Sequence, residues 1–290
     1  MNIKQNILLA TTLANIFTLN LQASEHNHTI HEPVSNHVIA EQRLALEKNT
    51  NNKGFGPQSP RDIDQIKGSN NRIFGTAPES SQMNLCNIHF HKNAEHKGGE
   101  FTTYAGNGNG HGFLSGYKFS GSLSHKESIS VNHEICPSKH GSLNAGDTIE
   151  VHYVYSTAKV SPGESLGSCL SKSINNPQLR VETQVYVLVN DKNALDFTTL
   201  TKHGIKNGLH QALNIPNNSG KPIQYTGSTT GPTYNEKGSP FQVTWSVRPN
   251  VLKVNTNTVG EWCKGNTFKE NHAHGVRNLV VNPKLLSNIK

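Results

Sequence analysis

The sequence predicts a mainly β protein, built on one large, mostly antiparallel twisted sheet with few short helices. Several segments alternate apolar and polar residues, which is the period of a half-buried strand. Asn, Gly, Ser and Thr are abundant and hydrophobic residues make up 33% of the chain, a composition that suits long connections between strands. Few segments have the 3.6-residue period of an amphipathic helix, so a helical bundle is excluded.

The first 23 residues have the organisation of a secretory signal peptide. Lys4 supplies a positive charge, residues 7–21 are apolar, and the small residue Ala23 precedes the expected cut. The apolar stretch is short for a membrane span, and no other long apolar run follows it. We therefore expect a periplasmic or secreted protein with no membrane span after cleavage.

Residues 24–75 are polar and rich in His, Asn and Gln, which predicts a loosely packed arm. A short amphipathic helix is expected near residues 39–46. Residues 76–290 show no internal repeat and are predicted to form a single domain. The arm contains four histidines that could collect metal ions, namely His26, His28, His31 and His37.

Four segments of the domain are predicted to be strands. They are residues 85–91, 147–155, 180–189 and 241–247. The last is expected to end at Pro249, because proline has no N–H to donate to a sheet. A Gly-Asn run within residues 105–116 predicts a loop, since glycine is costly inside a strand or helix.

The formal net charge is +7, but Lys and Arg are scattered and form no basic run. This pattern indicates a solvated basic surface and argues against nucleic-acid binding. The four cysteines form no Cys-x-x-Cys pair, which argues against a thiolate zinc site and fits disulfides in an oxidising compartment. Their pairing stays open among Cys86, Cys136, Cys169 and Cys263.

Histidine spacing points to a metal site. His89 and His91 lie one residue apart in a predicted strand, so both imidazoles lie on the same face. His152 on a second predicted strand would complete three ligands, and three ligands with an open position are typical of catalytic zinc. A second His-x-His at residues 272–274 shows that spacing alone does not decide the matter. That pair is expected to belong to a C-terminal packing or capping segment.

The neighbours of these histidines favour a metal site. Glu150 lies two residues before His152, and Asn87 lies two residues before His89, each on the same strand face. A carboxylate or amide oxygen in this position can accept the other N–H of a ligand imidazole and fix its tautomer. Stray surface histidines have no need of such partners.

These segments resemble the zinc site of carbonic anhydrases. Residues 86–96, CNIHFHKNAEH, are most similar to the delta class, and residues 150–154, EVHYV, resemble the Glu-x-His-x-Val strand of the alpha class. Residues 225–232, YTGSTTGP, and residues 243–247, VTWSV, are similar to an alpha-class loop and the strand after it. The similarity keeps its order over about residues 85–248.

The resemblance implies a catalytic domain of the alpha-carbonic-anhydrase fold over residues 76–290. It implies the reversible hydration of CO2 to bicarbonate and a proton by zinc-bound hydroxide. The implied zinc ligands are His89, His91 and His152.

Further roles follow from the same resemblance. Thr230 would accept a hydrogen bond from the hydroxide and donate one to Glu95, and Thr229 takes this role if the loop register shifts by one. His96 would make a structural hydrogen bond beneath the site. No histidine matches the alpha-class proton shuttle. The apolar wall for CO2 would come from Val154, Val187 and Trp245.

Two other functions fit parts of the sequence. His89, His91 and Glu95 match the core of a cupin motif, in which Glu95 would contact the metal, but the flanking glycines and a second motif are missing. The His-rich arm is compatible with a catalytically silent periplasmic zinc-binding protein. A homodimer is compatible with the sequence, which does not determine the oligomeric state.

Overall fold

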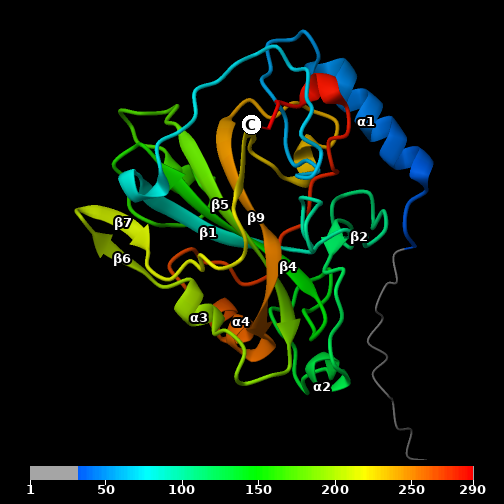
Figure 1. Ribbon diagram of the computed structural model, residues 1–290, viewed down its shortest axis with the longest axis vertical. Coiled ribbons are helices and arrows are strands. Elements are labelled where there is room, and N and C mark those ends of the chain that lie inside the picture. The colour runs from blue at the N-terminus through cyan, green and yellow to red at the C-terminus, as the bar shows by residue number, and fades with distance from the viewer. Residues whose placement is uncertain (1–31, 290) are drawn as a thin grey trace, which may run out of the picture. The chain divides into compact units, whose positions relative to one another are not determined.

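The computed structural model describes residues 32–289, and its central element is a five-stranded sheet with the strand order β1-β4-β5-β9-β8 (Figure 1). Neighbouring strands are antiparallel except for the parallel pair β5 and β9. The mainly β, mostly antiparallel fold is thereby confirmed. The five strands are β1 (Asn84–Lys92), β4 (Thr148–Ser156), β5 (Leu179–Val189), β8 (Ile223–Ser228) and β9 (Gln242–Asn255).

Smaller elements surround this sheet. Two-stranded sheets pair β2 (Thr103–Tyr104) with β3 (Tyr117–Lys118) and β6 (His203–Lys206) with β7 (Leu209–Ala212). The α-helices are α1 (Asn36–Thr50), α2 (His125–Ser128), α3 (Phe197–Leu200) and α4 (Thr256–Cys263). Within residues 32–289, no helix has the length and apolar character needed to cross a membrane. The predicted signal peptide and His26, His28 and His31 lie outside the described residues.

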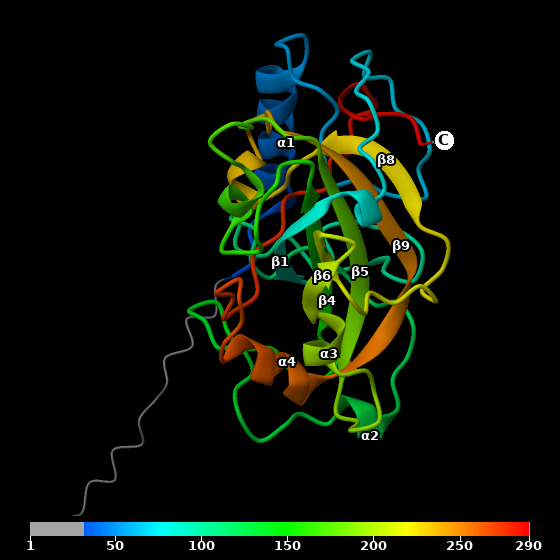
Figure 2. The same cartoon turned by 90° about the vertical axis from the view of Figure 1, so that its left-hand side faces the viewer.

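The sheet buries a different kind of side chain on each face. One face packs Phe90, Tyr153 and Tyr186 against Phe197 of α3 and Trp262 of α4, and this core is apolar. Figures 1 and 2 show α3 and α4 toward one end of the domain, with α1 toward the other. The opposite face carries the predicted histidines beside a second apolar core, which contains Val154, Val181, Val243 and Trp245. The polar residues of the site are therefore confined to one side of the sheet.

A β-bulge interrupts the start of β1. Leu85 pairs with Tyr155 and Asn87 pairs with Val154, so Cys86 is an extra residue in the ladder. The extra residue puts Leu85 in the same core as Ile88, whereas strict alternation would have placed it with Asn87 and the histidines. The bulge thus separates the polar end of the strand from its apolar start.

The strand predicted to end at Pro249 continues to Asn255. The pairing of β9 with β5 shifts register between Thr183 and Val185, and Pro249 falls in this irregular stretch. Proline is tolerated at a bulge because the ladder hydrogen bond is already interrupted there. The prediction was therefore wrong about where this strand ends.

Much of the segment predicted as a loosely packed arm packs against the domain, from helix α1 to Ile63, whereas residues 64–75 are mostly exposed. Helix α1 spans Asn36–Thr50, longer than expected, and its Leu46 packs with Val280 and Leu285. Further along, Gln58, Ser59 and Arg61 are fully buried beneath the site face of the sheet. Its polar residues order because they hydrogen-bond with the C-terminal part of the chain, as when the Arg277 guanidinium donates to the Ser59 carbonyl over 2.6 Å.

The four cysteines form two disulfides, Cys86–Cys169 and Cys136–Cys263. This confirms the expectation of disulfides and settles the pairing that the sequence left open. The first attaches the turn before Leu170 to the bulge of β1. The second attaches the loop before β4 to the end of α4.

Candidate metal centre

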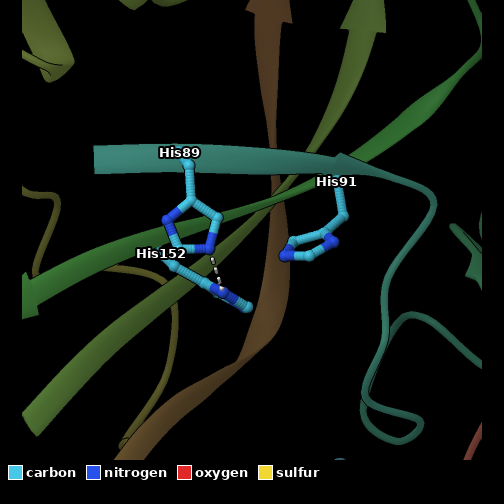
Figure 3. A group of neighbouring side chains, drawn as sticks. All are labelled: His89, His91 and His152. Carbon is cyan, nitrogen blue, oxygen red and sulfur yellow. Dashed lines mark hydrogen bonds between the residues drawn. The ribbon is translucent and has the colours of Figure 1, made fainter. Parts of the chain in front are cut away.

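Three imidazoles converge on the polar face of the sheet (Figure 3). His89 and His91 project from the same side of β1, as their spacing predicts, and His152 comes from the adjacent strand β4, directly opposite His89 in the register. One nitrogen from each ring lies within 4.8 Å of the others. His91 and His152 are buried, at 4% and 1% exposure, so the cluster is screened from bulk water.

Each imidazole is held through the nitrogen that points away from the cluster. His89 Nδ1 donates to Asn87 Oδ1 over 2.6 Å, and His91 Nδ1 donates to the Gly275 carbonyl over 2.9 Å. His152 Nε2 donates to Glu150 Oε1 over 2.6 Å. A neutral imidazole has one N–H, so these three bonds leave His89 Nε2, His91 Nε2 and His152 Nδ1 as unprotonated nitrogens.

These three nitrogens lack the partners that their burial requires. His91 Nε2 is buried with no hydrogen-bond partner among the described residues. His89 Nε2 and His152 Nδ1 face each other at 3.2 Å, the contact drawn as a dashed line in Figure 3. With both rings neutral, two lone pairs meet there, which is unfavourable unless a cation lies between them.

The donor set fits zinc. Two nitrogens bound to one tetrahedral zinc at about 2.0–2.1 Å lie about 3.3 Å apart, close to the separation between His89 and His152. Three neutral imidazoles with an open fourth position are the ligand set of a catalytic zinc site. The orphaned His91 nitrogen would supply the third bond.

Burial favours the neutral form of His89 and His91. Desolvation, with smaller contributions from neighbouring histidines, holds the pKa of His89 well below its usual value. Desolvation lowers the pKa of His91 to about 4, although Glu95 opposes the shift. Both rings therefore present lone pairs near pH 7, as metal binding requires.

Glu150 links two histidines beneath the cluster. Its Oε1 atom accepts from His152 and, over 2.7 Å, from His96 Nδ1, while Oε2 accepts from the His96 backbone N–H. Burial alone would raise the pKa of Glu150, but His96 and the hydrogen bonds from both imidazoles hold it well below its usual value. His96 Nε2 contacts the Tyr225 hydroxyl at 2.8 Å, which extends the buried network. These contacts match the supporting positions predicted for Glu150 and His96.

Glu95 lies behind His91, and neither group of possible metal ligands among the described residues includes it. Its Oε1 accepts from the Arg277 backbone N–H over 2.7 Å, and its buried Oε2 has no partner within residues 32–289. A cupin arrangement would require Glu95 to contact the metal, so this geometry argues against that reading.

The two candidate threonines differ in their contacts. The Thr229 hydroxyl is buried and shares a 2.5 Å hydrogen bond with Ser239. Thr230 is half-buried, and its hydroxyl forms no hydrogen bond with any described residue. Thr229 is thus anchored to its own loop, and Thr230 is available to a ligand.

A cavity of about 320 Å³ opens above the histidines. Val154 and Trp245 line it, as predicted. Val187, also predicted, is absent from the lining of this cavity; it pairs with Thr148, several residues along β5. Val187 lies on the same face of the sheet as the histidines, but it is too far along β5 to reach the cavity. The remaining apolar wall comes from Phe113, Leu166, Leu179, Val181, Pro232 and Val243.

The C-terminal segment contributes residues that sequence reasoning did not assign to the site. His272, His274 and Gly275 line the cavity, and Gly275 holds His91. The His274 ring lies 5.5 Å from that of His89, and its Nε2 contacts Glu270 at 2.7 Å. The second His-x-His motif was the available signal, although nothing in the sequence placed it beside the first.

The family model of the delta carbonic anhydrases matches residues 80–258, which is more than half of the chain. Among curated proteins, none matches this sequence. The match includes the three clustered histidines and both threonines, and it ends before Gly275.

Several solved structures are similar to this chain. The alpha-carbonic anhydrase from Thermovibrio ammonificans, in complex with the inhibitor sulfanilamide, is 14% identical over 77% of this chain and 84% of its own, with a TM-score of 0.26. The alpha-carbonic anhydrase of Photobacterium profundum is 15% identical over 79% and 88%, with a TM-score of 0.26. A hyperthermostable carbonic anhydrase from a hydrothermal vent chimney is 14% identical over 86% and 90%, with a TM-score of 0.28.

Proposed function

The chain belongs to the delta carbonic anhydrase family, and from this premise we propose that it is an exported zinc enzyme that reversibly hydrates CO2 to bicarbonate and a proton. The observation that carries the zinc assignment is the set of three buried imidazoles with their outward nitrogens already bonded. Bound zinc would lower the pKa of a coordinated water to about 7 and so supply hydroxide at neutral pH.

The residues of the chain would perform the remaining tasks. His89, His91 and His152 would hold the metal, and Asn87, Gly275 and Glu150 would fix their tautomers. The Thr230 hydroxyl would donate to the free Oε2 of Glu95 and would therefore have to accept from the nucleophile, which orients it toward CO2. Val154 and Trp245 belong to the apolar wall that would admit CO2 and exclude bulk water from it. All these residues belong to one chain.

The decisive measurement is a stopped-flow CO2 hydration assay on zinc-loaded protein, with His152→Ala as the inactive control. Activity should require about one zinc per chain and rise with pH through a transition near 7. Small anions and sulfonamides should inhibit, as expected for this family. Stoichiometric zinc binding without CO2 hydration would instead identify a silent zinc-binding protein.

The orienting threonine has its own test. Thr230→Ala should retain zinc and lower CO2 hydration by about 10²-fold, the usual effect of removing one positioned hydrogen-bond partner. Thr229→Ala is the matched control and should have a much smaller effect, since its hydroxyl contacts Ser239. The reverse ranking would assign the role to Thr229.

Export is proposed from the N-terminal sequence. Cleavage near Ala23 should release a mature chain into the periplasm or the medium. Mass spectrometry of that fraction would locate the new N-terminus. Recovery of the intact chain in the cytoplasm alone would contradict export.

A further inference from the structure

The amide of Asn87 lies between two groups that together determine its orientation. On one side its Oδ1 accepts from His89 Nδ1 over 2.6 Å, and on the other its Nδ2 donates to the Gly163 carbonyl over 3.0 Å. Asn87 is buried, at 1% exposure, so its amide depends on these two bonds. A carbonyl accepts and cannot donate, so Gly163 dictates which end of the amide faces His89.

The orientation of the amide in turn decides the tautomer of His89. With Oδ1 toward the ring, His89 carries its proton on Nδ1 and presents Nε2 to the metal. With the amide reversed, Nδ2 would donate to His89 Nδ1, and the ring proton would move to Nε2. That tautomer has no lone pair for the metal.

Gly163 is itself fixed to β1. Its N–H donates to the Cys86 carbonyl over 3.0 Å, at the bulge that precedes Asn87. The segment of residues 163–169 then returns to the same point through the Cys86–Cys169 disulfide, whose two cysteines are fully buried. The Cys169 carbonyl also accepts from the Ser156 hydroxyl of β4 over 2.7 Å. The 163–169 segment is thus attached at both ends to the strands that carry the histidines.

We propose that the Gly163 carbonyl, held by the backbone hydrogen bond from Gly163 to Cys86 and by the Cys86–Cys169 disulfide, is a positioning group that selects the metal-binding tautomer of His89 through Asn87. The disulfide thereby acts on the metal centre without contacting it. The proposal rests on the proposed function in taking zinc as the metal, whereas the tautomer of the metal-free protein is independent of it.

The sharpest test is Asn87→Asp with the disulfide intact. A carboxylate usually strengthens a histidine ligand, so this change alone would be expected to tighten zinc binding. Here the second carboxylate oxygen would face the Gly163 carbonyl where an N–H now donates. We therefore expect N87D to bind zinc about 10-fold more weakly in a chelator competition. Binding as tight as that of the wild type, or tighter, would overturn the proposal.

Removing the disulfide should reverse the effect of that change. C86A/C169A keeps the backbone hydrogen bond from Gly163 to residue 86 but frees the other end of the 163–169 segment. The Asn87 amide can then rotate more often, and zinc affinity should fall by about 2–10-fold as the fraction of the competent tautomer falls. In the N87D background the same removal should strengthen zinc binding, because the repulsion is relieved. C136A/C263A removes the other disulfide and should change zinc affinity by less than about 2-fold in either background. Equal effects of the two removals would contradict the proposal.

A measurement on the metal-free wild type keeps the proposal testable if a variant fails to fold. Nitrogen-15 chemical shifts of His89 in the metal-free wild type should show a protonated Nδ1 and an unprotonated Nε2. The opposite tautomer would refute the proposal whatever the variants do. If the zinc-loaded wild type does not hydrate CO2, the proposed function fails, while the tautomer and zinc-affinity results still decide this inference.

Discussion

Two His-x-His pairs, at residues 89–91 and 272–274, lie side by side in this protein, and they differ in backbone structure and in hydrogen-bond partners. His89 and His91 extend from one strand, and both donate their outward protons to fixed acceptors. His272 and His274 occupy an irregular segment, and His274 is paired with Glu270. The same sequence pattern therefore gives a cluster that could hold a metal where the backbone aligns the rings and fixed acceptors choose their tautomers.

The pKa of His274 moves in the opposite direction from the pKa values of His89 and His91. Burial, with neighbouring histidines, lowers the pKa of His89 and His91. Burial would also lower the pKa of His274, but the hydrogen bond and charge of Glu270 outweigh it and raise the pKa. The first pair is therefore neutral and able to bind a cation, and His274 is more readily protonated than a free histidine.

The largest expected difference between the pairs is in zinc content. His91→Ala should abolish stoichiometric zinc binding, because two imidazoles remain at a site built for three. His274→Ala is the matched control and should retain about one zinc per chain. Metal analysis after dialysis provides the measurement. Loss of zinc in the His274 variant together with its retention in the His91 variant would exchange the roles of the two pairs.

A smaller difference should separate the two supporting carboxylates. Glu150 accepts from His152 over 2.6 Å and Glu270 contacts His274 at 2.7 Å, so the isolated pairs look alike. Glu150→Gln should weaken zinc binding by roughly 10–100-fold, the usual scale for a partner of a metal ligand. Glu270→Gln should change it by less than about 2-fold. A competitive chelator titration of both variants distinguishes them, and equal effects would remove the contrast.

A separate effect concerns stability in acid. In the unfolded chain His91 titrates near 6.5, whereas in the folded, metal-free protein its pKa is about 4. Between these values the unfolded chain binds more protons, so stability should fall as pH falls through this window. The loss from His91 is on the order of 3 kcal/mol, from 1.36 kcal/mol for each pKa unit.

The same window tests the contrast between the pairs. His91→Gln should reduce the decline in the free energy of unfolding between pH 6.5 and pH 4, measured by urea titration without metal. His89, whose pKa burial also lowers, should account for part of the decline that remains. His274 has a raised pKa, so its contribution is present at low pH and is lost as pH rises. His274→Gln should therefore leave the decline in place. A decline that persists unchanged in the His91 variant would show that other groups cause it.

The central part of the fold and the clustering of His89, His91 and His152 could be predicted from the sequence because local rules govern them. Alternation along β1 and β4 placed the three histidines on one face, and the two-residue spacing placed Asn87 and Glu150 beside them. The pairing of β1 with β4 then brought His152 beside His89. Short-range sequence patterns can suggest such a pairing but do not determine it. The positions of the histidines relative to one another followed from the register.

Long-range contacts decided the features that the sequence did not reveal. Composition alone predicted a loose arm over residues 24–75, but contacts with residues around Arg277 order its described part. Val187 was assigned to the pocket because it lies on the site face of its strand, and that face says nothing about its distance from the site along the strand. The role of Gly275 could not be foreseen, because a backbone carbonyl has no sequence signature. The bulge at Cys86 and the strand through Pro249 are likewise set by their neighbours.

The Gly275 carbonyl has a consequence for the order in which the site can be completed. Synthesis reaches His91 and His152 long before it reaches Gly275, so a nascent chain contains all three imidazoles while His91 still lacks its acceptor. A fragment cut at the limits of the family match, residues 80–258, would lack that acceptor permanently. It would also lose Arg277, whose N–H holds Glu95, and the buried Ser59 that Arg277 contacts. The hydrogen bond that orients His91 is thus supplied by a segment that leaves the ribosome after all three histidines.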